Sequence, residues 1–205
     1  MGSKQVLLIG GFVEIIELCE DNKVKIIGII DPQKKNNYLS YPILGTEEDI
    51  DVWRKDFLNY EVLITPDFPK IRKKLVKIYK RNGFGFYTLI SNKANISKSS
   101  IIRTGSIVQA GANISSESII GRFVKVNSNA NIMHNVEVGN YSTLAPNAVL
   151  LGNVKIGQEC YIGANSTILP NISICNNVTI GAGTVVTKNI DTPNTTYVGI
   201  PAKRL

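Results

Sequence analysis

The sequence predicts two structural units, a small α/β domain at the N-terminus and a β-solenoid over most of the remainder. Within residues 1–89, apolar strand-like runs alternate with helix-like runs, which is the pattern of a parallel α/β unit. From residue 90 onward, every sixth residue is aliphatic, and Gly and Asn recur with a spacing of 18. A period of six is typical of solenoids, in which tight turns join short strands.

The hexapeptide repeat runs without a gap through 17 positions, from Ile90 to Val186. The residue two places before each aliphatic position is small or Val in 16 of the 17 repeats, with Ile172 as the exception. This period fits neither an α-helix nor an ordinary alternating strand. Three hexapeptides form one 18-residue triangular coil, so the aliphatic side chains are expected to stack in three internal columns.

Turn residues support the coil independently of the aliphatic pattern. Gly and Asn tolerate left-handed backbone angles, which the tight corners of stacked coils require. Two series of these residues recur with a spacing of 18: Gly111, Asn129, Asn147, Asn165 and Gly183 in one, and Asn135, Asn153, Asn171 and Asn189 in the other.

The N-terminal domain is expected to contain strands at 6–10, 25–31, 61–65 and 84–90, and helices at 12–20, 47–56 and 69–81. The last helix has Ile71, Leu75, Ile78 and Tyr79 as its expected apolar face. Its basic residues are expected to form the solvated face of an amphipathic helix: Lys70, Arg72, Lys73, Lys74, Lys77, Lys80 and Arg81.

Composition excludes several classes of function. The chain has one histidine, His134, so a zinc site built on two or three histidines of one chain is excluded. The net charge is +7, and residues 89–205 carry nine Lys or Arg against four Asp or Glu. A mild basic excess favours anionic small molecules such as phosphates over a nucleic acid as the partner.

Cysteine usage and hydropathy indicate a cytoplasmic protein. Cys19, Cys160 and Cys175 are odd in number and form no pairing motif, so we expect reduced thiols. No apolar run approaches the roughly 20 residues that a membrane helix needs. Residues 1–4 lead directly into an apolar strand, so no signal peptide is expected.

Several segments resemble a known family. The hexapeptides, with "TLISNKANIS", "GNVKIG", "ILPNISI", "IGAGTVVTKNI" and "YVGIPAKRL", are similar to hexapeptide-repeat, left-handed β-helix acyltransferases. Within these, the chain resembles bacterial sugar acetyltransferases of the sialic acid O-acetyltransferase and bacillosamine-pathway N-acetyltransferase type. γ-Class carbonic anhydrases share the repeat, but their zinc sites need three histidines.

The resemblance implies the fold and the domain roles. The fold is an α/β N-terminal domain with a small Rossmann-like parallel sheet, followed by a left-handed parallel β-helix. Residues 1–89 would bind a sugar or nucleotide, 90–190 would form the acyltransferase β-helix, and 191–205 would form a C-terminal tail in contact with coenzyme A. Family members are trimers that hold acetyl-CoA between neighbouring prisms, so a homotrimer is expected, with no metal.

The resemblance also implies catalytic residues. His134 in "NIMHNVEVG" would be the general base. Gly152, one coil of 18 residues later, would donate its backbone N–H to the oxyanion and lie against the cofactor. Relatives often have Asp or Glu directly after the histidine, where this chain has Asn135. Either another acid supplies the charge, or the base is weaker, or the acceptor is easier to deprotonate.

Further binding residues are implied at three places. Ala164 and Ala182 would let backbone amides approach the pantetheine arm, and Lys203 and Arg204 would meet the 3′-phosphate of coenzyme A. In the N-terminal domain, Gly10, Gly11 and Asp31 would bind the nucleotide of the acceptor. The glycine loop is about two residues shorter than in relatives, and a tight strand-to-helix turn explains Gly10-Gly11 equally well.

Three hypotheses about function follow. The first is acetyl-CoA-dependent N-acetylation of a nucleotide-linked amino sugar for bacterial surface glycans. The second is O-acetylation of sialic acid or of another sugar hydroxyl, which the short glycine loop and Asn135 favour. The third is a non-catalytic β-helix scaffold that forms a trimer, against which the presence of both His134 and Gly152 argues.

Overall fold

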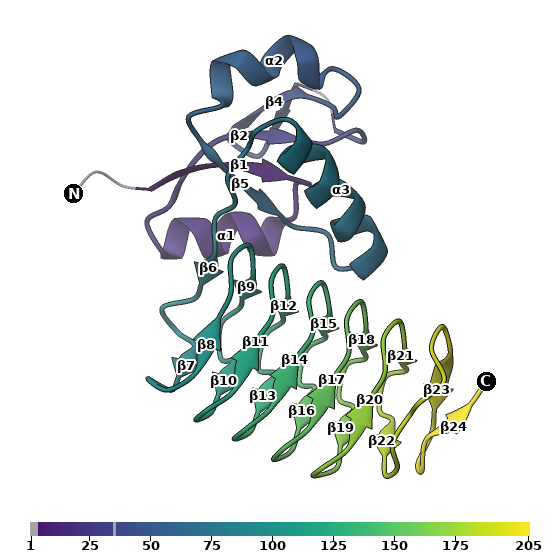
Figure 1. Cartoon of the computed structure of the whole chain (residues 1–205). Coiled ribbons are helices and arrows are strands. Elements are labelled where there is room, and N and C mark those ends of the chain that lie inside the picture. The colour runs from purple at the N-terminus through teal and green to yellow at the C-terminus, as the bar shows by residue number, and fades with distance from the viewer. Residues whose placement is uncertain (1–3, 35) are drawn as a thin grey trace.

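The computed structural model describes residues 4–34 and 36–205. Residues 1–3, on which the expectation of no signal peptide partly depends, lie outside the described residues. Figure 1 shows an α/β domain seated on a long β-helix, which confirms the predicted fold class. No helix in the described ranges is long and apolar enough to cross a bilayer.

The N-terminal domain has a five-stranded sheet in the order β3-β4-β2-β1-β5. Its strands are β1 (Gln5–Ile9), β2 (Lys25–Ile30), β3 (Asn37–Tyr38), β4 (Tyr41–Gly45) and β5 (Glu61–Ile64). Its helices are α1 (Val13–Asp21), α2 (Ile50–Phe57) and α3 (Pro69–Arg81). All strand pairs are parallel except β3 with β4.

The strands of this domain differ from the prediction in two places. The hairpin of β3 and β4 was not predicted. The strand expected over 84–90 is reduced to a bridge between Val62 and Phe86, and then to β6 (Leu89–Ile90), which already pairs within the β-helix. The chain therefore passes from one unit to the other with almost no linker.

The β-helix consists of three sheets of two-residue strands, with the three-residue β23 as the exception, and all strand pairs are parallel except β23 with β24. The eight-stranded sheet contains β6, β9 (Ile107–Val108), β12 (Lys125–Val126), β15 (Thr143–Leu144), β18 (Tyr161–Ile162), β21 (Thr179–Ile180), β23 (Thr196–Val198) and β24 (Lys203–Arg204). The six-stranded sheet contains β7 (Asn95–Ile96), β10 (Asn113–Ile114), β13 (Asn131–Ile132), β16 (Val149–Leu150), β19 (Thr167–Ile168) and β22 (Val185–Val186). The five-stranded sheet contains β8 (Ile101–Ile102), β11 (Ile119–Ile120), β14 (Glu137–Val138), β17 (Lys155–Ile156) and β20 (Ser173–Ile174).

The register confirms the 18-residue coil. Ile114 pairs with Ile132, Ile132 with Leu150, and Leu150 with Ile168, each one coil apart. The aliphatic side chains from residue 108 to residue 186 are buried in one core, while Ile90 at the first coil is 37% exposed. Burial of these columns is the main stabilising term of the β-helix.

Three rows of corner residues have positive φ. The first, the domain-side corner, consists of Gly105, Phe123, Tyr141, Glu159 and Asn177. The second, the histidine corner, consists of Glu117, Asn135, Asn153 and Asn171, and the third consists of Gly111, Asn129, Asn147, Asn165 and Gly183. The last two rows confirm the predicted ladders, except that Asn189 does not adopt positive φ and its side chain accepts a hydrogen bond from Ser173 N–H instead.

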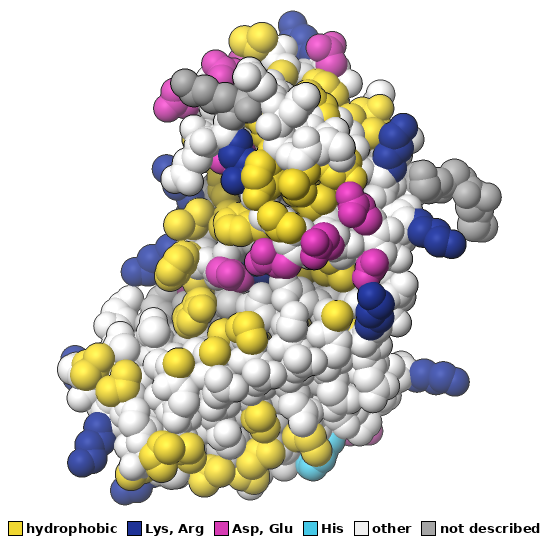
Figure 2. All heavy atoms as spheres, turned by 180° about the vertical axis from the view of Figure 1, so that it is seen from behind, with side chains coloured by type: hydrophobic (Ala, Val, Ile, Leu, Met, Phe, Trp, Pro, Cys, Tyr) yellow, Lys and Arg dark blue, Asp and Glu magenta, His cyan; other side chains and the backbone are white. Residues whose placement is uncertain are grey.

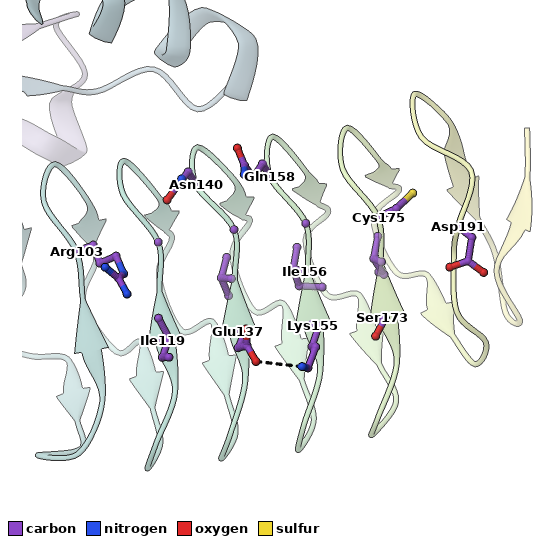
Figure 3. A pocket seen from close by; sticks show the side chains of 15 residues that line it. Arg103, Ile119, Glu137, Asn140, Lys155, Ile156, Gln158, Ser173, Cys175 and Asp191 are labelled. Carbon is purple, nitrogen blue, oxygen red and sulfur yellow. Dashed lines mark ion pairs between the residues drawn. The ribbon is translucent and has the colours of Figure 1, made fainter.

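The corners of the β-helix determine where the N-terminal domain and the histidine lie. The N-terminal domain packs on the domain-side corner, whereas the one histidine lies at the edge of the β-helix away from that domain (Figure 2). Between these two corners, the outer face of the five-stranded sheet is hollowed by a groove of about 450 Å³ (Figure 3). Glu137 and Lys155 form an ion pair of 3.2 Å across its floor.

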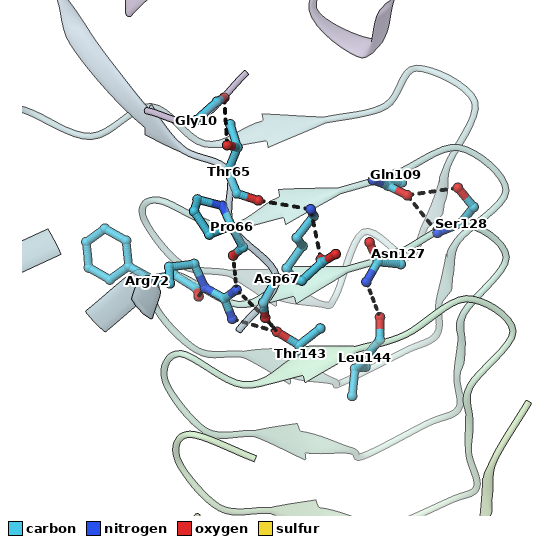
Figure 4. Close-up of polar contacts among 12 residues, drawn as sticks. Gly10, Thr65, Pro66, Asp67, Arg72, Gln109, Asn127, Ser128, Thr143 and Leu144 are labelled. Atoms are coloured by element: carbon cyan, nitrogen blue, oxygen red, sulfur yellow. Dashed lines mark hydrogen bonds and ion pairs between the residues drawn. The ribbon is translucent and has the colours of Figure 1, made fainter. Parts of the chain in front are cut away.

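Arg72 joins the two units, contrary to the expectation of a solvated basic face. Its side chain is 1% exposed, and it donates from Nε to Phe123 O at 2.7 Å and from Nη2 to Thr143 Oγ1 at 2.8 Å (Figure 4). Its Nη1 also donates to Pro66 O, and its Nη2 to Tyr141 O. Burial lowers the pKa of Arg72 to about 10, so the guanidinium remains charged at neutral pH.

The expected faces of α3 therefore need correction. Ile71, expected on the apolar face, is 50% exposed, while Arg72, Val76 and Tyr79 are buried. Lys73 also turns inward, to an ion pair with Glu159. Arg72 faces the β-helix because its guanidinium donates hydrogen bonds to the backbone carbonyls of the corner. These charge-assisted hydrogen bonds offset the free-energy cost of burying a cation.

Candidate functional site

His134 lies at the histidine corner, directly after β13 and before β14. Asn135 adopts φ of 58°, and its N–H donates to Ser116 O at 3.0 Å, which links this corner to the same corner of the preceding coil. The imidazole is consequently exposed on the outside of the prism. This position leaves the ring accessible to a ligand held against the β-helix.

Two hydrogen bonds along the corner link the imidazole first to Asn135 and then, through Asn135, to Glu117. His134 Nδ1 lies 3.0 Å from Asn135 Oδ1, and Asn135 Nδ2 donates to Glu117 Oε2 at 2.7 Å. Glu117 therefore supplies the carboxylate that the position after the histidine lacks. Sequence reasoning missed Glu117, although the signal was present, because residue 117 lies one 18-residue coil before residue 135.

Gly152 lies beneath the imidazole, as the spacing of 18 predicts. A Cβ atom at Gly152 would come within 2.6 Å of His134 Cε1 and 2.7 Å of Nε2, so only glycine leaves the ring in this place. Within the residues that the structure describes, the Gly152 N–H pairs with no backbone or side-chain acceptor. Among the described residues, the N–H groups of Ser116 and His134, at the equivalent positions of this corner, also have no acceptor. The feature that distinguishes Gly152 from these two residues is its lack of a side chain.

Gly10, Gly11 and Asp31 come together at the carboxyl ends of β1 and β2. The Asp31 carboxylate accepts from Gly11 N–H and from Gln33 N–H, both at 2.9 Å. Gly10 has φ of 96° and donates its N–H to Ile30 O. The N–H groups of both glycines therefore already donate to acceptors within the protein. The Asp31 carboxylate stabilises the loop by accepting these hydrogen bonds from Gly11 and Gln33.

A cavity of about 410 Å³ opens beside this turn, at the edge where ligands bind in open α/β sheets. Gly10, Phe12, Asp31 and Phe68 are among its lining residues. A side chain that sequence reasoning missed lies close by. Lys125 of the β-helix, 1% exposed, donates to Thr65 O at 3.0 Å and pairs with Asp67 at 2.8 Å. Burial lowers the pKa of Lys125, while Asp67 opposes that shift.

The residues expected to bind coenzyme A are spread over the β-helix. Ala164 and Ala182 lie at the third corner, where Ala164 O accepts from Gly183 N–H. Lys203 and Arg204 form β24, which pairs antiparallel with β23 and is exposed. Among the described residues, no group of three or more His, Cys, Asp or Glu is arranged to hold a metal ion.

Within one chain, the predicted site residues therefore fall into clusters that lie apart from one another. His134, Asn135 and Gly152 form one cluster, and Gly10, Gly11 and Asp31 form a second. The second cluster lies in the N-terminal domain, which docks on a different corner from the histidine (Figures 1 and 2). Ala164 and Ala182 lie at the remaining corner, across the six-stranded sheet from His134.

Comparison with a family model supports the repeat. The bacterial transferase hexapeptide (six repeats) model matches residues 117–152 and 153–188, which include His134 and Gly152. A comparison with the curated proteins gives no match.

Several solved structures are similar over the whole chain. The acetyltransferase domain of PglB from Neisseria gonorrhoeae, in complex with acetyl coenzyme A, has a TM-score of 0.90 and 27% identity, and the match covers 100% of each chain. PerB from Caulobacter crescentus, in complex with CoA and GDP-perosamine, has a TM-score of 0.91 and 25% identity, with 100% of this chain and 98% of that chain covered.

A GDP-perosamine N-acetyltransferase variant from Caulobacter crescentus, in which a histidine is replaced by alanine, has a TM-score of 0.92. At 24% identity, with 100% of this chain and 97% of that chain covered, it supports the fold alone. The repeats and the full-length likeness confirm the predicted left-handed β-helix fold and the predicted resemblance to hexapeptide-repeat acetyltransferases.

Proposed function

We propose that the protein transfers the acetyl group of acetyl-CoA to the amino group of a nucleotide-linked sugar, with His134 as the general base. The observation that carries this proposal is the exposed His134 ring, held over Gly152 and bonded through Nδ1 to Asn135. Two solved relatives with 25% identity or more contain acetyl coenzyme A in one case, and CoA with GDP-perosamine in the other.

The proposed mechanism uses one proton acceptor and one oxyanion donor. With Nδ1 engaged by Asn135, His134 Nε2 is free to take a proton from the sugar amine as its nitrogen attacks the thioester carbonyl. The Gly152 N–H would donate to the oxygen that becomes negative in the tetrahedral intermediate. Collapse forms the amide and releases the thiolate of coenzyme A, which takes the proton back from the imidazolium.

The separation of the two clusters supports a homotrimeric enzyme. In one chain, the cavity beside Asp31 and the imidazole of His134 lie at different corners of the prism. A sugar held by a nucleotide in that cavity would therefore meet the histidine of a neighbouring subunit. Ala164 and Ala182 at the third corner would likewise face the cofactor from across the subunit boundary.

An acceptor screen tests the proposed function. UDP-, dTDP-, GDP- and CMP-linked amino sugars are incubated with acetyl-CoA, and release of the free thiol is measured together with the mass of the sugar product. We expect an N-acetylated product from at least one of them. Acetylation of a hydroxyl alone would favour the O-acetyltransferase hypothesis, and no binding of coenzyme A by calorimetry would favour the scaffold.

Asp31→Ala tests the role of the N-terminal domain. Loss of the carboxylate releases Gly11 N–H and Gln33 N–H and loosens the wall of the cavity. The KM for the nucleotide sugar should rise at least tenfold, while the KM for acetyl-CoA should stay within about twofold. Small and equal changes in both constants would mean that the domain does not hold the acceptor.

A further inference from the structure

We propose that Glu117 is a positioning residue that selects the tautomer of His134 through the Asn135 side chain. The inference rests on the proposed function insofar as the selected tautomer is the one that a general base needs. It follows from two contacts along the histidine corner, Glu117 Oε2 to Asn135 Nδ2 at 2.7 Å and Asn135 Oδ1 to His134 Nδ1 at 3.0 Å.

Glu117 fixes the orientation of the Asn135 amide. An ionised carboxylate only accepts hydrogen bonds, whereas an amide has a donor end and an acceptor end. Glu117 therefore requires the NH₂ group of Asn135 on its side. The amide oxygen is then directed toward the imidazole.

The orientation of the Asn135 amide in turn determines which nitrogen of His134 carries the proton. Because Asn135 Oδ1 only accepts, the nitrogen that faces it, Nδ1, must carry the hydrogen of the neutral ring. Nε2 then has a free lone pair. An amide in the opposite orientation would place a donor against Nδ1 and would move the ring proton to Nε2, which could no longer accept one.

The other side chains of the histidine corner have no such carboxylate. Asn153 Nδ2 donates to Asn171 Oδ1 at 3.1 Å, an amide-to-amide contact that would be equally possible with both groups reversed. A ladder of amides alone therefore has no fixed direction. At the coil that carries the histidine, the ladder ends on a carboxylate, and a charge-assisted hydrogen bond of this kind is about twice as strong as a neutral one.

The backbone of the histidine corner aligns Glu117 with Asn135. Glu117 and Asn135 have φ of 57° and 58° and occupy equivalent positions in successive coils, so their side chains leave the corner side by side. Glu117 N–H also donates to Ser99 Oγ at 3.1 Å. The contact is thus built into the stacking of the coils and does not depend on a mobile loop.

Nitrogen NMR of the untagged protein tests this proposal directly, because the chain contains one histidine and gives one imidazole spin system. At a pH where the ring is neutral, the native protein should show a protonated Nδ1 and an unprotonated Nε2. Glu117→Gln should give a mixture of tautomers. Ser99→Ala, which removes the backbone contact but keeps the carboxylate, should retain the native spectrum.

Kinetics with the acceptor identified in the screen provide a second readout. Glu117→Gln should lower kcat about tenfold, the difference between a charged and a neutral hydrogen bond, with KM for acetyl-CoA unchanged. The double variant Glu117→Gln with Asn135→Asp exchanges the carboxylate and the amide. Its Asp accepts from both neighbours, so it should restore the Nδ1-protonated ring and bring kcat back to within about threefold of the native value.

Three results would overturn the proposal. They are an Nε2-protonated ring in the native protein, an unchanged spectrum and kcat in Glu117→Gln, and a double variant that is no better than the single one. If no acceptor is acetylated, the proposed function fails, but the NMR comparison still decides whether Glu117 selects the tautomer.

Discussion

His134 and Gly152 show how one spacing creates a site. The two residues lie 18 positions apart, so they occupy the same corner in successive coils, and the ring of one covers the α-carbon of the other. The imidazole needs no pocket of its own, because the missing side chain of the glycine provides the space.

Gly152→Ala should therefore damage catalysis more than folding. The added Cβ would lie 2.6 Å from His134 Cε1, and the imidazole is a side-chain end that can swing away. We expect kcat to fall at least tenfold with the free energy of unfolding changed by less than about 1 kcal/mol. Gly85→Ala is the matched control, since its Cβ would meet Glu61 Cγ at an ordinary 3.4 Å. Native kcat in Gly152→Ala would remove the glycine from the mechanism.

Sequence reasoning predicted the residues of the histidine cluster better than their connections. The position of Gly152 followed from arithmetic on the repeat. The role of Glu117 did not, because the comparison with relatives directs attention to the residue next to the histidine and not to the residue one coil away. Likewise, the sequence placed Asp31 at the end of its strand but did not reveal that its carboxylate accepts hydrogen bonds from its own loop.

At the scale of elements, α3 shows the limit of helical patterns. Seven basic residues in a 13-residue helix indicate a solvated face, and most of them do lie outside. Arg72 is fully buried because the corners of the β-helix present backbone carbonyls that lack N–H partners on their outer side. A pattern confined to the helix cannot reveal acceptors that lie about 50 to 70 residues away in the chain.

Arg72→Met tests whether this contact holds the two units together. The variant leaves the carbonyls of Phe123, Tyr141 and Pro66 buried without their donor, so the free energy of unfolding should fall by about 3–5 kcal/mol. Urea denaturation measures this change. Lys77→Met, on the exposed side of the same helix, should change it by less than about 0.5 kcal/mol. Equal effects of the two variants would contradict the assigned role of Arg72.

The hairpin of β3 and β4 was missed for a local reason. Pro42 lies within β4, and a proline normally argues against a strand because it has no N–H to donate. The strand is tolerated because it pairs with β3 over only two residues and lies near the edge of the sheet. Its partner β3 is too short to leave a periodic pattern.

At the scale of the whole molecule, the β-helix was predictable almost to the residue, because each coil repeats the same burial and the same turn. The domain-side corner was not predicted, since Phe123, Tyr141 and Glu159 are unusual at positive φ. Stacking of Phe123 on Tyr141, at 5.4 Å between ring centroids, accompanies this conformation. The position of the N-terminal domain on that corner was likewise beyond the reach of the repeat pattern.

The buried thiols make the stability of the whole molecule sensitive to alkaline pH. Burial raises the pKa of Cys160 to about 11, compared with about 8.5 for a thiol in an unfolded chain. Between these values the unfolded chain has lost a proton that the folded protein retains, so the free energy of unfolding falls as pH rises, by about 1.4 kcal/mol per unit.

Cys160→Val removes this contribution. Valine occupies the equivalent position in four other repeats, at residues 124, 136, 154 and 178, so the substitution should fold. Between pH 8.5 and pH 10, urea titrations should show a loss of unfolding free energy about 2 kcal/mol smaller than in the native protein. An identical loss in both proteins would mean that the Cys160 thiol ionises as readily in the folded state as in the unfolded chain.

The central claim is that His134 acts as the general base of an acetyl transfer, and a comparison of His134→Ala with the native protein tests it most directly. Steady-state rates with acetyl-CoA and the acceptor from the screen give kcat, and calorimetry gives the Kd for coenzyme A. We predict that kcat falls by about 10²–10⁴-fold, the usual contribution of a general base, while the Kd changes by less than about threefold. A His134→Ala protein that turns over at the native rate would contradict the account.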